Sequence, residues 1–146
     1  MNAVVLQTAA RVVMPVMLLL SLVALVRGHN EPGGGFVGGL LAAAGFALYG
    51  LAYRVDDARR MLRRDPRTLI GAGLLLAVAS GLPGVLGSAP YMKGVWYSIP
   101  IPATDTVLKI GTPLFFDIGV YLVVIGITLL MIFALEDARD GDTAHR

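Results

Sequence analysis

An acid inside an apolar run is the residue of this sequence with the clearest potential for chemistry. Asp117 is the single charged residue between positions 110 and 135. A carboxylate in a bilayer core costs about 2.5–3.5 kcal/mol on insertion scales, so such residues usually face a protein interior or a water-filled cavity. They often mark ion or proton pathways.

Helical spacing places other polar side chains in line with this acid. One face, at steps of four, seven and eleven residues, carries Asp117, Tyr121, Val124 and Thr128. Gly119 and Gly126 lie on roughly the opposite face. The pattern predicts a helix with one polar stripe and one packing stripe.

The preceding apolar run contains a helix breaker. In "SGLPG" (80–84), Pro83 removes a backbone donor, kinks the helix and frees the carbonyl of Ala79. Interrupted helices supply carbonyls for cation coordination in many transporters. Pro83 and Asp117 each lie about 10 Å from the outer end of their runs, so we expect them to share a layer.

These features favour an ion path over the alternatives. We expect Asp117, Tyr121 and Thr128, with carbonyls near Ala79 and Ser80 beside Pro83, to line a path for Na⁺ or H⁺ from the outer side. The alternative is a protonated, hydrogen-bonded carboxyl with a structural role.

The glycine-rich stretch "HNEPGGGFVGGL" (29–40) imitates a nucleotide-binding turn. Gly33, Gly35 and Gly38 fit G-x-G-x-x-G, and Asp56 follows at a suitable distance in sequence. A phosphate-binding turn needs a strand before it and a soluble helix after it. Here apolar helices flank the glycines and place Asp56 roughly 30 Å away across the membrane. The motif is therefore a coincidence.

The same glycines form two overlapping G-x-x-x-G pairs, which allow helices to approach closely in lipid. The pairs are Gly34 with Gly38 and Gly35 with Gly39, and Phe36 lies between them. Pro32 suits the first turn of this helix. The alternative is that the glycines, which carry no side chains, border an aqueous opening on the outer side together with His29 and Glu31.

Composition defines the elements that must position these residues. Apolar residues make up 56% of the 146-residue chain and charged residues only 15%, against about 25% in a soluble domain. The charges leave four long apolar runs, and a spanning helix needs about 20 such residues. The sequence predicts a single all-α integral membrane domain, residues 1–146, with its third helix broken near Ser80–Gly84. The spans are 5–26, 34–53, 68–91 and 110–135.

Charge asymmetry predicts the orientation. Six arginines lie in the 54–67 loop, and Lys and Arg concentrate on the cytoplasmic side. That loop, both termini and the 136–146 tail are therefore expected in the cytoplasm, with the 92–109 loop outside. Anionic lipid head groups are compatible with the arginine run, whereas interleaved aspartates argue against nucleic acid.

Catalysis is not expected. The chain has no cysteine, and its two histidines, His29 and His145, are predicted on opposite sides of the membrane. We expect no enzyme activity, no cofactor and no metal beyond a transported Na⁺. One intramembrane acid is too few for a complete carrier, because proton pathways use chains of ionisable groups. The chain therefore looks like part of a larger assembly.

Two motifs carry a family resemblance. "GHNEPGGGFVGGLLAAAGFALYGLA" (28–52) and "LKIGTPLFFDIGVYLVVIG" (108–126) resemble the B-type subunit of the Mrp-type multisubunit cation/proton antiporters, the MnhB/MrpB family. "YSIPIP" (97–102) also fits, and the resemblance runs from about position 7 to position 137.

The resemblance implies a function. Family members are small multi-pass subunits of bacterial plasma-membrane complexes that exchange Na⁺ for H⁺ and contain large subunits akin to those of respiratory complex I. Residues 32–36 match the family's glycine motif, and Asp117 matches its intramembrane acid. The alternative is a purely structural interaction subunit, in the same complex or in a membrane hydrogenase-type assembly.

Overall fold

The computed structural model describes residues 3–28, 34–88, 90–91, 93–100 and 107–144. The predicted residues His29, Glu31, Pro32 and Gly33 lie outside the described residues. Four helical segments in the described part are long and apolar enough to cross a membrane. They are Val4–Arg27, Gly34–Ala52, Pro66–Leu86 and Thr112–Arg139. The predicted all-α membrane class with four spans is confirmed.

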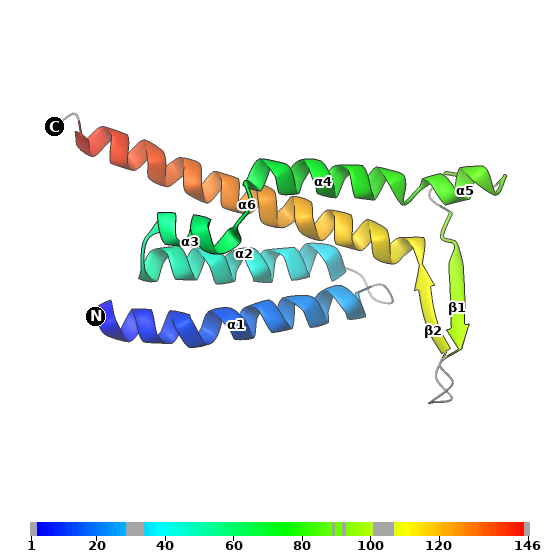
Figure 1. Ribbon diagram of the computed structural model, residues 1–146, viewed down its shortest axis with the longest axis horizontal. Coiled ribbons are helices and arrows are strands. Elements are labelled where there is room, and N and C mark those ends of the chain that lie inside the picture. Colours follow the sequence, from blue (N-terminus) through cyan, green and yellow to red (C-terminus); the bar gives the residue numbers. More distant parts are fainter. Residues whose placement is uncertain (1–2, 29–33, 89, 92, 101–106, 145–146) are drawn as a thin grey trace.

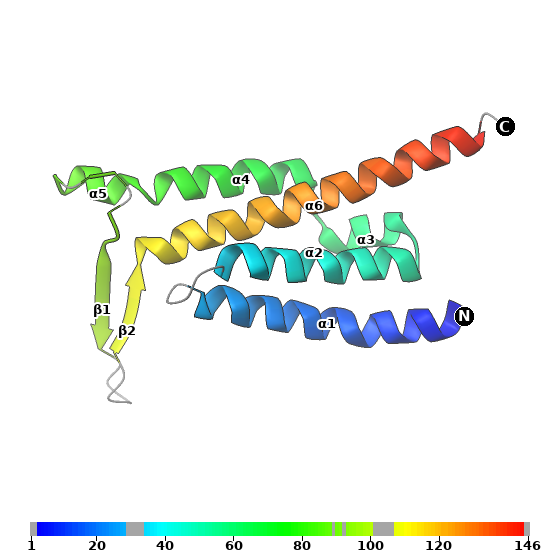
Figure 2. The same ribbon diagram turned by 180° about the vertical axis from the view of Figure 1, so that it is seen from behind.

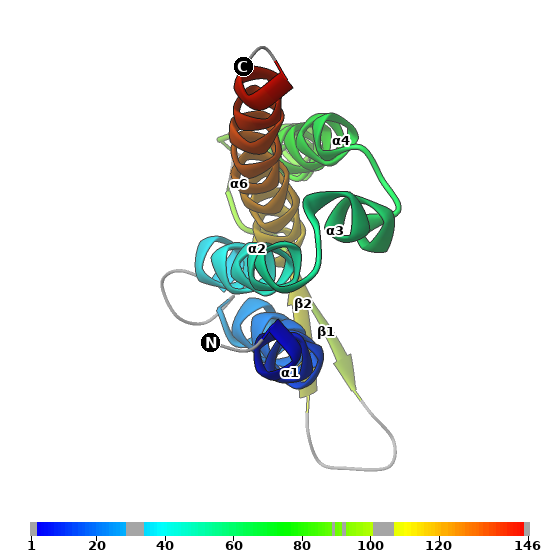
Figure 3. The same ribbon diagram turned by 90° about the vertical axis from the view of Figure 1, so that its left-hand side faces the viewer.

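The helices form an open row rather than a closed bundle. Helix α1 (Ala3–Arg27) packs on α2 (Gly34–Ala52), α2 packs on α6 (Thr112–Ala144), and α6 packs on α4 (Pro66–Ala79). An end-on view shows this order from α1 through α2 and α6 to α4 (Figure 3). Helix α6 therefore separates α4 from the α1–α2 pair.

Apolar side chains cover the outside of this row. Val5, Leu20, Leu51, Leu75 and Leu135 are each more than half exposed. Such exposure suits lipid, where apolar side chains are the favourable surface.

A short amphipathic helix, α3 (Val55–Leu62), lies in the predicted arginine loop and packs beside α2. Arg63 ends it in the left-handed conformation with φ 59°. Asp65 then caps α4 by accepting a 2.8 Å hydrogen bond from the Arg67 amide, and Pro66 occupies the first turn. The start of α1 and the end of α6 lie at this end of the row (Figure 1).

The predicted outer loop contains a two-stranded antiparallel sheet. Strand β1 (Trp96–Pro100) pairs with β2 (Val107–Gly111), with Trp96 opposite Gly111 and Pro100 opposite Val107. The hairpin projects from the helices at the end away from the termini (Figure 2). Thr112, the first residue of α6, makes two hydrogen bonds to Val95, which precedes β1. The Thr112 amide donates to the Val95 carbonyl at 3.0 Å, and the Thr112 hydroxyl accepts from the Val95 amide at 3.1 Å.

The third span is divided into α4 and α5 (Leu82–Leu86) at Ser80 and Gly81. The Gly81 amide donates to the carbonyl of Val78, three residues back. The Ser80 hydroxyl donates to the Ala77 carbonyl at 2.6 Å, and the Tyr91 hydroxyl to the Val78 carbonyl at 2.9 Å. Side-chain hydroxyls therefore bond to the backbone on the α4 side of this division.

Candidate functional site

The glycines of α2 pack closely against two neighbouring helices, α1 and α6. A Cβ built on Gly35 would overlap the backbone carbonyl of Asp117, and one on Gly39 would lie 2.8 Å from the Val124 Cβ, both in α6. A Cβ on Gly38 would lie 2.8 Å from the Ser21 carbonyl in α1. These contacts support close packing as the role of the glycines, because any side chain would force the helices apart.

The remaining motif residues divide between packing and lipid. Gly34 is buried against the backbone of Gly28, at the end of α1. Phe36 is 55% exposed on the outside of α2. Its aromatic ring therefore contributes to the lipid-facing surface, and the buried part of the described motif is backbone.

Asp117 lies on the face of α6 that meets α2. It is partly buried, about one and a half turns from the start of α6, and its backbone touches Gly35. Because Gly35 is the second residue of α2, Asp117 lies level with the first turn of that helix. The acid is thus placed toward one end of the helix row, close to where α1 connects to α2.

Tyr121, one turn further along α6, makes a hydrogen bond that crosses α2. Its hydroxyl lies 2.7 Å from the Ser21 hydroxyl in α1, and Ser21 is completely buried. Gly38 makes this contact geometrically available, because a Cβ there would meet both the Ser21 carbonyl and the Tyr121 ring. A polar link between α1 and α6 therefore lies within the spans, one helical turn from Asp117.

The two predicted faces of α6 lie on opposite sides of the helix, as expected, but the polar face also packs closely against a neighbouring helix. Asp117, Tyr121 and Val124 face α2, whereas Gly119 and Gly126 face α4. A Cβ on Gly119 would lie 2.7 Å from the Gly73 carbonyl, and one on Gly126 would lie 2.7 Å from the Pro66 carbonyl. Thr128 is partly buried, two turns beyond Tyr121.

The expected meeting of Asp117 with the division in the third span is wrong in two respects. Gly119 packs against Gly73 and Ala77, so Asp117 lies level with about Ala77, roughly 9 Å deeper than Pro83. The acid also faces α2, on the opposite side of α6 from α4.

Ser80 lies near a different part of α6. It lines a small pocket of about 130 Å³ with Thr112, Pro113 and Phe116 at the start of that helix. Pro83 is partly buried and Ala79 is exposed. The site that the structure assembles is therefore Asp117, Tyr121 and Ser21 around the α2 glycines, without Ala79, Ser80 or Pro83.

Sequence reasoning missed Ser21, although one signal was present. Ser21 is the only polar residue between positions 12 and 26. A second missed contact joins Arg11 in α1 to the Tyr53 hydroxyl just after α2, at 2.9 Å, while Tyr53 stacks on Tyr49. Hydrogen bonds thus hold α1 at two points about three turns apart, Arg11 and Ser21.

The site contains the carboxyl group of Asp117 and the hydroxyls of Ser21 and Tyr121. Their oxygens can coordinate a small cation or transfer a proton. Within the described residues, no three His, Cys, Asp or Glu side chains gather closely enough to hold a metal.

Comparisons with known proteins agree with this architecture. Residues 5–130 match the family described as "Domain related to MnhB subunit of Na+/H+ antiporter". The chain is 40% identical to the B subunit of the Na⁺/H⁺ antiporter of Bacillus subtilis, over 90% of this chain and 91% of that protein. It is 38% identical to the antiporter's B subunit from Alkalihalophilus pseudofirmus, over 93% and 94% of the two chains.

A solved structure shares the fold. A chain in the structure of the Mrp complex from a Dietzia species superposes with a TM-score of 0.74 and 38% identity over 88% of this chain. The match covers only 13% of that longer Dietzia chain. The present chain belongs to the MnhB family, whose domain is related to the MnhB subunit of Na⁺/H⁺ antiporters.

Proposed function

We propose that the chain is a small, non-catalytic membrane subunit of a bacterial multisubunit Na⁺/H⁺ antiporter. Its partners would be the other membrane subunits, large and small, and the transported ions Na⁺ and H⁺. The names of the Bacillus subtilis and Alkalihalophilus pseudofirmus relatives support the antiporter role, and they match this chain over nearly their full lengths.

Within that function we propose that Asp117 lines a cation path that opens toward the outer side. The observation that carries this proposal is the position of Asp117 at the α2–α6 contact, with its backbone against Gly35. A Cβ on Gly35 would overlap the Asp117 carbonyl, so the backbones of α2 and α6 lie directly against each other at the acid. The buried Ser21–Tyr121 pair continues the polar surface one turn deeper.

A purely structural role is the second candidate. It is favoured by the glycine contacts on both sides of α6, since Gly35 and Gly39 of α2, and Gly73 of α4, serve helix packing. In this case Asp117 would hold the helices together and would not contact a transported ion.

Substitution of Asp117 distinguishes the two roles. In the complete complex, Asp117→Asn preserves the size and much of the hydrogen bonding of the side chain but removes its charge. We expect the variant to co-purify with its partner subunits in normal amounts, and Na⁺-driven proton movement in membrane vesicles to fall at least tenfold. Asp137→Asn removes a charge from the same helix outside the apolar run and serves as the matched control.

Each outcome selects one role. Normal assembly with lost exchange in Asp117→Asn alone supports the ion path. Loss of assembly favours the structural role, and normal assembly with normal exchange rejects the ion path for this residue.

A further inference from the structure

A pocket of about 460 Å³ lies at the arginine-rich end of the helix row, between the α3–α4 connection and α6. Three arginines line one side of it: Arg59, Arg64 and Arg67. Apolar residues of α6 line the other side: Leu130, Phe133 and Ala134. Cationic and apolar walls facing each other suit an amphipathic anion.

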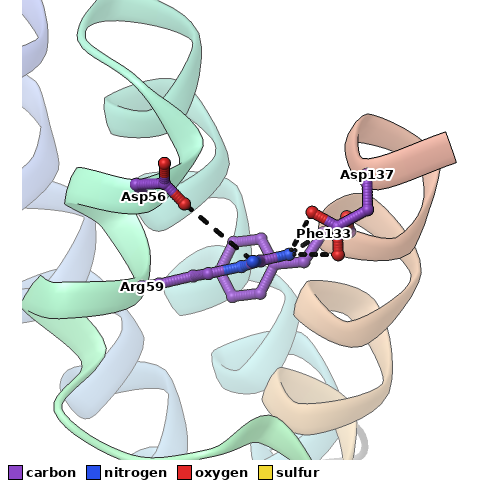
Figure 4. A network of polar contacts seen from close by, with 4 residues as sticks. All are labelled: Asp56, Arg59, Phe133 and Asp137. Atoms are coloured by element: carbon purple, nitrogen blue, oxygen red, sulfur yellow. Dashed lines mark hydrogen bonds and ion pairs between the residues drawn. The ribbon is translucent and has the colours of Figure 1, made fainter. Parts of the chain in front are cut away.

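The acids of this pocket are already engaged. Both carboxylate oxygens of Asp137 accept hydrogen bonds from Arg59, at 2.8 and 2.7 Å (Figure 4). The same guanidinium donates to the Phe133 carbonyl at 3.2 Å and lies 4.9 Å from the centre of the Phe133 ring. Asp65, the other acid, caps α4. Arg59 and Asp137 thus neutralise each other, and Asp65 adds one negative charge beside the Arg67 amide.

Arg64 and Arg67 remain as the cations of the pocket. Neither forms an ion pair with any residue in the described part of the chain, and both are exposed. The first turn of α4 adds the positive end of a 14-residue helix at the same place. The three arginines and two aspartates of the pocket leave a net charge of +1, which favours an anion beside Arg64 and Arg67.

The pocket lies where two helices change from apolar to charged. Helix α6 carries no charge between Ile118 and Leu135 and becomes charged at Glu136, while α4 is uncharged from Thr68 onward. Met131 and Leu135, beside the pocket wall on α6, are 62% and 71% exposed. This is the arrangement expected at the boundary between hydrocarbon and head groups.

We propose that this pocket binds an anionic phospholipid. The phosphate accepts hydrogen bonds from Arg64 and Arg67, because a guanidinium presents paired donors that match phosphate oxygens. An acyl chain lies along Leu130 and Ala134 and continues over the exposed apolar face of α6. The site is separate from Asp117, which lies near the other end of the same helix, and it does not depend on the antiporter role.

The test measures lipid binding to the purified full-length chain by native mass spectrometry. Phosphatidylglycerol is the probe, with phosphatidylcholine of the same acyl chains as the neutral comparison. Each arginine near an anionic lipid contributes about 1 kcal/mol, so Arg64→Gln/Arg67→Gln should weaken phosphatidylglycerol binding about 30-fold. Arg60→Gln/Arg63→Gln removes the same charge from residues outside the pocket, and we expect it to change binding less than threefold.

Several outcomes would overturn the proposal. Equal losses in the two double variants would mean that net charge, rather than this pocket, attracts the lipid. No loss in the pocket variant would reject the site directly. Displacement by soluble glycerol 3-phosphate as strong as that by the lipid would assign the site to a free phosphate ester.

A second measurement does not depend on the variants folding. Phosphatidylglycerol carrying a photoreactive acyl chain should crosslink the wild-type chain mainly within the last apolar turns of α6, around Leu130 to Ala134. Labelling concentrated on other helices would contradict the proposed position of the acyl chain.

Discussion

Replacing Gly35 by alanine tests whether α2 and α6 are held together by direct backbone contact. The new methyl group would overlap the Asp117 backbone carbonyl, which cannot rotate away as a side chain can. The helices would have to separate by roughly 1 Å, and a gap of that size forfeits a quarter to a half of each van der Waals contact. Gly71 is the matched control, because a Cβ there would have nothing within 4 Å.

The two substitutions should change stability in opposite directions. Overpacking a close contact costs about 1–3 kcal/mol, and alanine regains little at Gly35, which is only the second residue of α2. We therefore expect Gly35→Ala to lower the free energy of unfolding by about 1–2 kcal/mol. Gly71 lies inside α4, where alanine is favoured by up to about 1 kcal/mol. The pair should thus differ by about 2–3 kcal/mol.

The assay is unfolding of the full-length chain in mixed micelles, followed by helical circular dichroism and by fluorescence of Trp96, the single tryptophan. The expected difference corresponds to about a 30- to 140-fold change in the unfolding equilibrium between the two variants. Shifts in the same direction for Gly35→Ala and Gly71→Ala would refute the reasoning, because helix propensity alone would then explain both.

Two further substitutions test the polar contacts between helices. Tyr121→Phe removes the hydrogen bond to Ser21 and should cost about 0.6–1.7 kcal/mol, the range for such bonds in membranes. A double-mutant cycle with Ser21→Ala checks this, and fully additive costs would show that the two hydroxyls are not coupled. Asp137→Asn should cost less than about 1 kcal/mol, because Arg59 and Asp137 are 37% and 64% exposed and exposed ion pairs are weak. The loss should shrink in 1 M NaCl, where charges are screened, and a loss above about 2 kcal/mol would mean that the pair is shielded from solvent.

The residues that share one face of α6 could be predicted from the sequence, because the helical period fixes the angle between residues of the same helix. Asp117 and Tyr121 share a face, and Gly119 and Gly126 share the opposite one, as the spacing required. The four spans were predictable for a similar reason, since chain length between charges bounds what can cross lipid.

Register between helices was not predictable in this way. The sequence places Pro83 by its distance from the outer end of the apolar run 68–91, but α5 ends at Leu86 and a hairpin follows. The end of an apolar run is not the end of a helix, and the ends of two helices need not lie in one plane. Gly73 against Gly119 sets the true register, and this contact depends on tertiary packing.

Long-range polar partners were also beyond the sequence. Arg59 and Asp137 are 78 residues apart, and the arginine run as a whole is adequately explained by topology. Ser21 was visible as an isolated polar residue, but its partner depends on how α1 crosses α2 at Gly38. The glycine that allows Ser21 and Tyr121 to meet lies in α2, so the sequences of α1 and α6 do not reveal this contact.

The row order has a consequence for biosynthesis. Helix α1 finds its packing partner as soon as α2 has left the ribosome, so an α1–α2 hairpin can form early during insertion. Helix α4 is made after α3, yet its extensive packing is with α6, which is synthesised later. Between those two events α4 must remain in the translocon or in lipid with its glycine face uncovered. The interval before α6 arrives is therefore when this face of α4 is open to a chaperone or a neighbouring subunit.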